Sequence, residues 1–339
     1  MSSVYKTFLN DDVVSTKSLL HENIPITGTI VTGTYSDLNI KNYSHGMFQS
    51  VYDYPYLSSS ANHIFDISVG LSPTLSASVN TQNAKKIQLY NQMAQVLAGN
   101  DITGSIQKFD QDGDITAGGT KHNQVFFLNF SRLLTKDEIK KGSFSLVVGT
   151  GSSFLGTPNT SSLKTMSDYG AATEYRVNSP AGEYGILYTS SLAVEGTGVG
   201  LLYYQAGIAV ITSSVFNLAQ VVSGASSVNA AFTGSTIQAI SDGIRRRFNN
   251  CQFNNTTELN STIYFCRVNH NEFNYSSNPT YLSASQIRLK DTESDQPASY
   301  ITTIGLYSTD NELLAVAKLS EPLKKTPESE LILRTRIDY

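Results

Sequence analysis

The alternation of apolar and polar residues over positions 300–339 is the strongest structural pattern in this chain, and it predicts three β-strands in succession. β-branched and aromatic residues fill positions 300–307, and a Ser-Thr-Asp-Asn turn separates them from a second run at 312–319. After a charged connection that contains two prolines, the alternation resumes at 331–338, almost at the end of the sequence. We therefore expect this block to be β structure.

The last of these strands has one apolar face and one charged face. Its apolar positions are Leu331, Leu333 and Ile337, and the charged positions between them are Arg334, Arg336 and Asp338. Successive side chains of a strand point to opposite faces, so the charged ones should face solvent or a neighbouring chain. Arg334, Arg336 and Asp338 are therefore candidate assembly contacts.

Helical periodicity is confined to a few segments. An apolar stripe predicts a helix over about 81–98, and a second stripe predicts one over about 235–248. A capping box formed by Thr135 and Glu138 predicts a short helix over 136–141.

Most of the remaining apolar segments are short and bounded by turn residues, as in strands. The compact run at 125–130 is typical of a strand buried on both faces, and the glycine-interrupted segment 182–216 predicts an antiparallel meander. Further strands are expected at 143–148, 261–268 and 286–290. The expected fold class is mainly β with a few helices, in antiparallel sandwich-like lobes.

The pattern suggests an arm and two lobes. Residues 1–35 contain short apolar pieces separated by Pro25 and Gly28, which predicts an extended N-terminal arm that lies on other structure. Residues 36–180 and 181–339 are expected to form two β-rich lobes, because a chain of 339 residues exceeds the size at which one core stops growing.

Composition favours contact with protein over contact with nucleic acid or membrane. Charged residues make up 15% of the chain, against roughly 25% in an ordinary globular protein. A net charge of −4 provides no broad footprint for nucleic acid or an anionic membrane. The one basic cluster, Arg245, Arg246 and Arg247, lies at the end of a predicted helix, where it complements the helix dipole, forms an ion pair between subunits or contacts nucleic acid. We keep these arginines as candidate assembly contacts and expect no nucleic-acid partner.

The sequence predicts a protein that is made and kept in a cytoplasm, or that leaves it by lysis. The first residues lack the basic and apolar regions of a secretory signal, and no apolar run reaches the ~18 residues of a membrane span. Cys251 and Cys266 are the only cysteines, and whether they pair remains open. Two cysteines and five histidines show no zinc spacing, so no metal or cofactor is expected.

Catalytic motifs are absent from the sequence. Asp110, Asp112 and Asp114 alternate like the carboxylates of a calcium loop, but Ile115 stands where the turn glycine belongs and Lys121 where the bidentate glutamate belongs. A polar hairpin turn is therefore the favoured interpretation. No nucleophile elbow or phosphate-binding loop is present, so we expect no enzymatic activity and no small-molecule substrate. A hydrolase would need a paired-carboxylate or nucleophile motif.

Tyrosines cluster between positions 48 and 65. Tyr52, Tyr54 and Tyr56 are joined by small polar residues, which suits either burial at a protein interface or stacking on a sugar. The absence of tryptophan weakens the sugar alternative, and the tyrosines are kept as candidate assembly contacts. His63 and Asp66 suggest either a base with its orienting carboxylate or a hydrogen-bonded structural histidine.

Several sequence blocks resemble structural proteins of large tailed bacteriophages, chiefly contractile-tailed ones. These blocks are LLHENIPITGTIV, SHGMFQSVYDYPYLSSSANHIFDISVG, TQNAKKIQLYNQMAQVLAG, FFLNFSRLLTKDEIKKGSFSL, SPAGEYGILY, GLLYYQAGIAVIT and ITTIGLYSTDNELLAVAKLSEPLKKTPESELILRTRIDY. The resemblance spans most of the chain.

The resemblance implies a virion protein that forms rings in the tail or baseplate and is assembled in the bacterial host cytoplasm. Its implied partners are other copies of itself and other phage tail proteins. A neck or collar protein, a fibre-attachment protein, and a receptor- or carbohydrate-binding β module of the virion are the alternatives. No catalytic residues follow from the resemblance.

Overall fold

The chain folds into two compact units that do not follow the expected boundary between residues 180 and 181. A computed structural model describes residues 5–25, 36–75, 80–114, 118–151, 162–189, 197–216, 221–222, 224–276, 278–284, 286–288, 290 and 292–339. Unit 1 comprises Met1–Ser18 and Glu258–Tyr339, and unit 2 comprises Leu19–Thr257. The fold is mainly β with antiparallel sheets, which confirms the predicted fold class.

The boundaries between the units fall inside two long strands. These are β1 (Val13–Pro25) and β12 (Phe248–Val268), which are neighbours in one sheet. β1 is the described part of the expected arm, and positions 26–35 lie outside the described residues. Short 3-10 turns occur as η1 (Asn10–Asp12), η2 (Asp37–Asn39), η3 (Ser213–Phe216) and η4 (Pro279–Tyr281).

A seven-stranded sheet forms the centre of unit 2. In sheet order its strands are β2 (Ile40–Asn42), β3 (Phe48–Tyr52), β4 (His63–Leu71), β5 (Gln124–Phe130), β11 (Ile208–Thr212), β10 (Gly200–Tyr203) and β9 (Tyr184–Leu187). Each strand pairs antiparallel with its neighbour. Strands β9, β10 and β11 form the meander that the glycine-interrupted segment predicted.

The central strand β5 is buried on both faces, as its compact apolar run predicted. Phe126 and Leu128 join the larger hydrophobic cluster of unit 2, whereas Val125 and Phe127 join the smaller one. This alternation follows from the period of two in a strand. The sheet therefore has a packed layer on each side.

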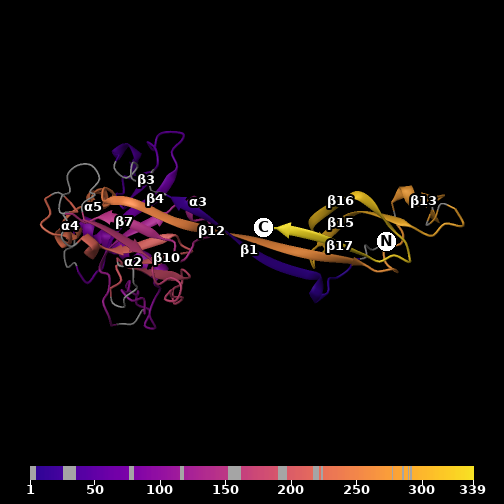
Figure 1. The fold of residues 1–339 in the computed structure, drawn as a ribbon, viewed down its shortest axis with the longest axis horizontal. Coiled ribbons are helices and arrows are strands. Elements are labelled where there is room, and N and C mark those ends of the chain that lie inside the picture. Colours follow the sequence, from indigo (N-terminus) through magenta and orange to yellow (C-terminus); the bar gives the residue numbers. More distant parts are fainter. Residues whose placement is uncertain are drawn as a thin grey trace. The chain divides into compact units, whose positions relative to one another are not determined.

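Helix α2 (Thr81–Leu97) covers one face of this sheet and coincides with the helix predicted over 81–98 (Figure 1). The Asn80 side chain caps it by accepting a hydrogen bond from the Asn83 backbone N–H at 2.8 Å. Tyr90, Ala94 and Leu97 are buried in the smaller hydrophobic cluster. Packing of this stripe on the sheet stabilises the helix more than its own propensity does.

A second sheet covers the other face and makes unit 2 a sandwich. The first part of β12 pairs with β7 (Ser145–Gly149) and β6 (Glu138–Ile139), and β7 pairs with β8 (Leu163–Ser167). Rings from the two sheets meet in the larger cluster, with the Phe130 and Phe253 centroids 5.2 Å apart. Helices α4 (Val228–Gly234) and α5 (Ile237–Arg245) add Phe232, Ile240 and Ile244 to this cluster.

The helix predicted over 136–141 is wrong. The helix at this point, α3, spans Arg132–Thr135 instead, and Lys136 ends it with a φ of 55°. Glu138 and Ile139 then pair with β12, and Ile139 is buried in the larger cluster. The second predicted helix, 235–248, is shorter than expected because Phe248 already begins β12.

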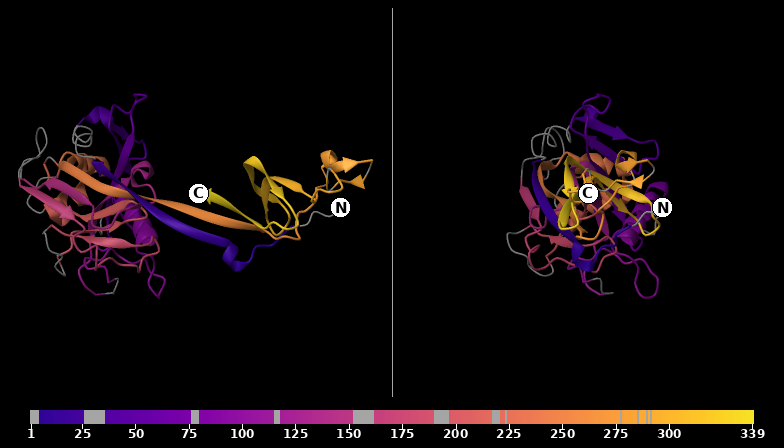
Figure 2. Two further views of the ribbon diagram at one scale, coloured as in Figure 1. Left: turned by 45° about the vertical axis from the view of Figure 1, so that its right-hand side comes forward. Right: turned by 90° about the vertical axis from the view of Figure 1, so that its right-hand side faces the viewer.

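Unit 1 consists of strand pairs at its described residues. The second part of β12 pairs antiparallel with β17 (Leu331–Asp338), in a register that runs from Ser261 opposite Asp338 to Val268 opposite Leu331. β15 (Ser299–Tyr307) and β16 (Leu313–Lys325) form a hairpin, and β13 (Leu282–Ser283) pairs with β14 (Gln286–Ile287). β15 and β17 coincide with the first and third predicted C-terminal strands, whereas β16 continues six residues past the predicted end at 319, through the expected connection, because 323–325 pair with 299–301. The hairpin and β17 gather around β12 (Figure 1 and Figure 2).

Candidate functional site

Unit 1 buries very few of its apolar side chains. Among its described residues, the buried hydrophobic ones are Val268 and Leu306. Both hydrophobic clusters of the described structure lie in unit 2. Because burial of apolar surface is the main favourable contribution to folding, unit 1 lacks the stabilisation that a core provides.

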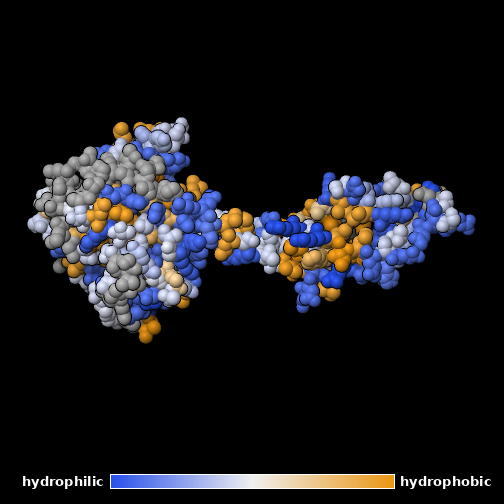
Figure 3. Space-filling view, viewed as in Figure 1, coloured by the Kyte–Doolittle hydropathy of each residue, from blue (hydrophilic) through white to orange (hydrophobic). Residues whose placement is uncertain are grey.

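Large apolar side chains lie on the surface of unit 1 instead. They are Tyr5, Phe8, Leu9, Val13, Val14, Leu259, Phe273, Tyr275, Leu282, Tyr300, Tyr307, Leu313, Leu314, Val316, Ile332 and Tyr339. Figure 3 shows hydrophobic residues gathered on one face of this unit. An exposed patch of this kind marks a binding surface on a folded protein.

The densest part of this surface is the turn end of the β15–β16 hairpin. Tyr307, Leu313, Leu314 and Val316 form it, and we call these four residues the apolar hairpin end. Leu314 is 68% exposed and Val316 51% exposed. Tyr307 pairs with Leu313, and both side chains close over Gly305, whose Cβ position lies 2.8 Å from Tyr307 Cε2 and 3.3 Å from Leu313 Cδ1.

Polar contacts fix the shape of this hairpin at its tip and at its base. At the tip, the Ser308 backbone N–H donates to the Glu312 carbonyl at 2.9 Å, and Asn311 has a φ of 64°. At the base, the buried Lys325 ammonium donates to the His270 carbonyl at 3.0 Å and to Asn274 Oδ1 at 2.8 Å. The apolar hairpin end is thus presented by an ordered strand pair.

Strand β17 exposes the charged face that the sequence predicted. Arg334, Arg336 and Asp338 are all exposed. Arg336 Nε donates to Asp338 Oδ1 at 2.6 Å, and Ser261 Oγ donates to the same carboxylate at 2.5 Å. These contacts lower the pKa of Asp338, with the Ser261 hydrogen bond as the largest cause.

Two of the three arginines in the basic cluster at the end of α5 are buried inside unit 2. Arg245 and Arg247 are 2% and 1% exposed, so neither side chain is presented to a neighbour. Arg247 donates to the Gly149 and Gly151 carbonyls at 3.0 and 2.9 Å. Arg246 is the member of this cluster that reaches the surface, as a candidate assembly contact.

Asp37 ties the same cluster to turn η2. Arg245 Nη2 and Arg246 Nη2 both donate to Asp37 Oδ1, the latter at 3.2 Å. Arg245, which lies closer, is the largest cause of the lowered pKa of Asp37. Arg245 also donates to Asp242 Oδ1 at 2.9 Å, so its charge is balanced by two carboxylates inside unit 2.

The tyrosine cluster lies at the end of β3 in unit 2. Tyr54 is 56% and Tyr56 38% exposed, while Tyr52 is half-buried, with its ring tilted against that of Tyr56 and the two centroids 6.4 Å apart. Burial is the largest cause of the raised pKa of Tyr52. These tyrosines remain accessible and keep their place as candidate contacts.

His63 and Asp66 lie together beside this cluster. His63 Nε2 lies 2.9 Å from Asp66 Oδ1, which also accepts a hydrogen bond from Ser50 Oγ at 2.5 Å. The Ser50 hydroxyl thus donates to the carboxylate, whereas the serine of a Ser-His-Asp triad donates to the imidazole.

The acidic loop has converging carboxylates at its described residues, and positions 115–117, on which the predicted hairpin turn falls, lie outside them. Asp110 bridges to Lys121 across the turn, and single oxygens of Asp110, Asp112 and Asp114 lie within 4.8 Å of one another. Burial, above all, raises the pKa of Asp110 to about 6. The convergence of all three carboxylates is a feature that the sequence reasoning did not assign.

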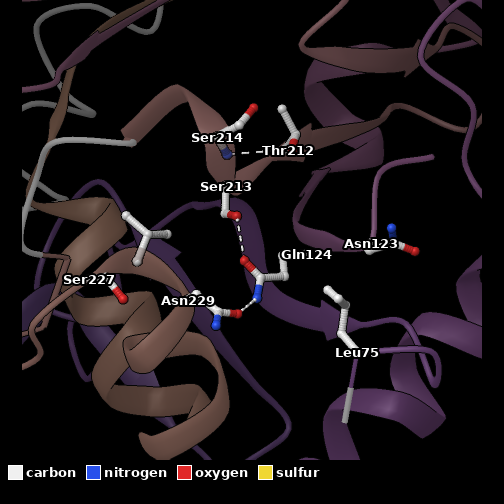
Figure 4. A pocket seen from close by; sticks show the side chains of 9 residues that line it. Leu75, Asn123, Gln124, Thr212, Ser213, Ser214, Ser227 and Asn229 are labelled. Carbon is white, nitrogen blue, oxygen red and sulfur yellow. Dashed lines mark hydrogen bonds between the residues drawn. The ribbon is translucent and has the colours of Figure 1, made fainter. Parts of the chain in front are cut away.

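A cavity of about 360 Å³ opens between β5, β11 and α4 in unit 2 (Figure 4). Its lining residues are Leu75, Asn123, Gln124, Thr212, Ser213, Ser214, Ser227, Val228 and Asn229. Ser213 Oγ donates to Gln124 Oε1 at 3.1 Å, and Gln124 Nε2 donates to Asn229 Oδ1. This lining offers neutral hydrogen-bonding groups and supplies no acid, base or activated nucleophile.

Comparisons with protein-family models, with curated proteins and with solved structures found no match. They neither support nor oppose the resemblance to phage structural proteins. Within the part of the chain that the structure describes, no helix is both long and apolar enough to cross a membrane.

Proposed function

We propose that the chain is a non-enzymatic structural subunit of a tailed-phage virion that assembles with other protein chains through unit 1. The observation that carries this proposal is the exposed apolar surface of unit 1, above all the apolar hairpin end, in a unit with almost no buried hydrophobic residues. Such a surface is stabilised when a partner removes it from water. The resemblance of the sequence blocks supports the virion setting.

The partner proposed for this surface is a second copy of the chain. Strand β17 has β12 as its one partner among the described strands, so its other edge is available for strand addition. The Arg336–Asp338 pair beside it is internally neutralised, which permits close approach of another protein surface. Repetition of such a head-to-tail contact closes a ring when the rotation between copies allows it.

Within the virion, we place the subunit first at the baseplate or tail. A neck or collar position and a fibre-attachment position are the alternatives. Ring assembly needs surfaces that bind neighbouring subunits, and unit 1 offers exposed tyrosine, leucine and valine side chains for such contacts.

The assembly proposal is tested by the mass of the purified full chain in solution. Size-exclusion chromatography with light scattering should detect oligomers at micromolar concentration. Leu314→Asp together with Val316→Asp should yield monomers, because a carboxylate in the interface would be buried without a partner. Leu133→Asp is the matched control, since Leu133 is 77% exposed in unit 2 and should leave the oligomer intact.

A monomeric wild-type chain at all concentrations, or an oligomer unchanged by the double substitution, would contradict assembly through the apolar hairpin end. Circular dichroism distinguishes loss of assembly from loss of folding. The substitutions lie outside the hydrophobic clusters of unit 2, so a folded variant should keep the wild-type spectrum of that unit. The virion setting has a separate test: mass spectrometry of purified phage particles should detect the chain, and a cryo-EM map should locate it as a ring.

A carbohydrate-binding module is the second candidate function, and the tyrosine cluster favours it. Tyr54 and Tyr56 are exposed, and exposed aromatic rings suit the faces of a sugar. A glycan array probed with the full chain tests this candidate. Specific binding that Tyr54→Ser and Tyr56→Ser abolish would favour it, and absence of binding would reject it.

A further inference from the structure

The acidic loop of unit 2 is anchored through backbone carbonyls. Arg176 Nη2 donates to the Asp112 carbonyl at 3.3 Å. Asn178 Nδ2 and Tyr184 Oη donate to the Gly113 carbonyl at 3.1 and 3.0 Å. These three hydrogen bonds hold the loop against segment 176–184.

The three aspartates of this loop converge. One oxygen from each of Asp110, Asp112 and Asp114 lies within 4.8 Å of the others, although like charges repel at this distance. The burial of the three differs, since Asp110 is buried, Asp112 is half-buried and Asp114 is exposed. One side of the cluster is therefore open to solvent and to entry of an ion.

Asp110 is the buried member of the cluster, and one of its two carboxylate oxygens lacks a hydrogen-bond partner. Its side chain is 2% exposed, and Oδ1 is buried without a hydrogen-bond partner, while Oδ2 accepts a hydrogen bond from Lys121 Nζ. An unpartnered buried carboxylate oxygen costs free energy and is rare in folded proteins. It therefore needs a ligand to explain it.

Space beside this oxygen is kept by a glycine. Gly119 has a φ of +73°, and a Cβ placed on it would lie 3.6 Å from Asp110 Oδ1. A side chain at position 119 would narrow the space next to the oxygen, and an L-residue would also be strained at this φ. Gly119 therefore leaves space next to Asp110 Oδ1.

We propose that this loop binds one calcium ion through Asp110 Oδ1 and one oxygen each of Asp112 and Asp114, with water completing the coordination. Calcium prefers several carboxylate oxygens in a flexible arrangement, whereas magnesium demands a tighter octahedron and keeps more of its water. Lys121 and Arg176 place positive charge near the loop and oppose cation binding. The site is therefore weaker than one with a glutamate at position 121.

Terbium luminescence provides a direct test. The chain has no tryptophan, and Tyr184 is hydrogen-bonded to the loop, so excitation of tyrosine should sensitise a terbium ion held there. The full chain, freed of metal with a chelator, is titrated with Tb³⁺ and then with Ca²⁺ or Mg²⁺. We expect a saturable signal of one ion per chain, which Ca²⁺ displaces at concentrations at least tenfold lower than Mg²⁺.

Substitutions assign this signal to the loop. Asp112→Asn and Asp114→Asn should each weaken binding by roughly tenfold or more, since each removes a charged ligand. Lys121→Gln should strengthen binding, because it removes a competing cation from Asp110. Asp101→Asn is the matched control, because Asp101 Oδ1 already accepts hydrogen bonds from the Thr103 and Ser105 backbone N–H groups at 2.8 and 2.9 Å.

The proposal fails if the terbium signal does not saturate, or if Asp112→Asn and Asp114→Asn bind as tightly as the control. Isothermal titration with Ca²⁺ repeats the comparison without a fluorescent ion. Circular dichroism of each variant establishes that unit 2 is folded. Because the loop lies away from the apolar hairpin end in sequence and in its own unit, this test is independent of the assembly proposal.

Discussion

At the scale of single residues, unit 2 contains charged side chains that are buried and hydrogen-bonded to its own backbone. Lys86 on α2 donates to the Phe232 carbonyl at 2.6 Å and to the Ser235 carbonyl at 2.5 Å, where α4 ends and its carbonyls lack helical partners. Burial lowers the pKa of Lys86 to about 8. Lys86 lies one turn before Tyr90 on the buried face of α2. The helical period predicts that position 86 shares this face, but it does not predict that a lysine is buried there.

Asp168 is a second buried charge, and its removal should destabilise the chain. Its carboxylate accepts hydrogen bonds from the Gly142 and Phe144 backbone N–H groups at 2.6 and 3.2 Å and from Tyr204 Oη at 3.0 Å. Asp168→Ala leaves these donors unpaired, so we expect a loss of about 2–4 kcal/mol in urea unfolding. Tyr204→Phe removes one donor and should cost about 1 kcal/mol; equal losses in the two variants would contradict this account.

His122 should make the stability of unit 2 depend on pH. Burial lowers its pKa to about 4, and its Nε2 has no hydrogen-bond partner. As the pH falls below 6.5, His122 binds a proton in the unfolded chain, whereas in the folded chain it does so only near pH 4. The free energy of unfolding should therefore decrease as the pH falls through this window. Between pH 7 and pH 5 the loss from this residue should be about 2 kcal/mol.

The His122 contribution is isolated by comparing the wild type with His122→Leu at each pH. Asp110, whose raised pKa shifts stability in the opposite direction as pH falls, is present in both proteins and cancels in the difference. Urea unfolding at pH 7, 6 and 5 measures that difference. A difference that stays constant with pH would show that His122 has the same pKa in the folded and the unfolded chain, and would contradict this prediction.

At the scale of elements, local patterns predicted most strands and the long helix but not the contacts between distant segments. β5, β7, β17 and α2 lie where periodicity placed them, because each carries its own apolar pattern. The capping box at Thr135 failed because Ile139 is buried by pairing with β12, a contact more than a hundred residues away in sequence. Long-range pairing overrides a local preference of about 1 kcal/mol.

In the candidate site, too, the sequence predicted the features that depend on a local pattern and missed those that depend on contacts between distant segments. Alternation placed Arg334 and Arg336 on the exposed face of β17, and the structure leaves them there. The burial of Arg245 and Arg247 depends on carboxyl and carbonyl groups from distant segments, such as Asp37 and Gly149, which no local pattern brings together. Exposure of the apolar hairpin end was likewise hidden, because an apolar strand looks the same whether or not another layer covers it.

Close packing within the large sheet gives an element-scale prediction at Gly200. A Cβ on Gly200 would lie 2.5 Å from the Val210 carbonyl oxygen, a backbone atom of the paired strand β11. Gly200→Ala should therefore force β10 and β11 apart and cost about 2 kcal/mol or more in urea unfolding. Gly234→Ala is the control, since its Cβ would meet nothing within 4 Å and it should be neutral or slightly stabilising. Equal stability of both variants would contradict the packing argument.

At the scale of the whole molecule, the two units differ in how they are stabilised. Unit 2 has a packed layer on each face of its central sheet, whereas the described part of unit 1 relies on strand pairing, turns and ion pairs such as Lys6–Glu272 at 2.5 Å. Exposed ion pairs contribute little free energy, and a hairpin without a covered face is marginally stable. The order of unit 1 should therefore depend on association with a partner.

Hydrogen–deuterium exchange tests this dependence on the intact chain. In dilute solution the amides of β15, β16 and β17 should exchange much faster than those of β4 and β5, because they open without disrupting a core. Raising the concentration into the range where the chain associates should slow exchange in the three unit 1 strands by at least about tenfold and leave β4 and β5 unchanged. Leu314→Asp with Val316→Asp should remove this concentration dependence, and Leu133→Asp should preserve it. Protection in unit 1 that equals that of β5 at the lowest concentration would show that unit 1 is stable alone, and its apolar hairpin end would then need another explanation.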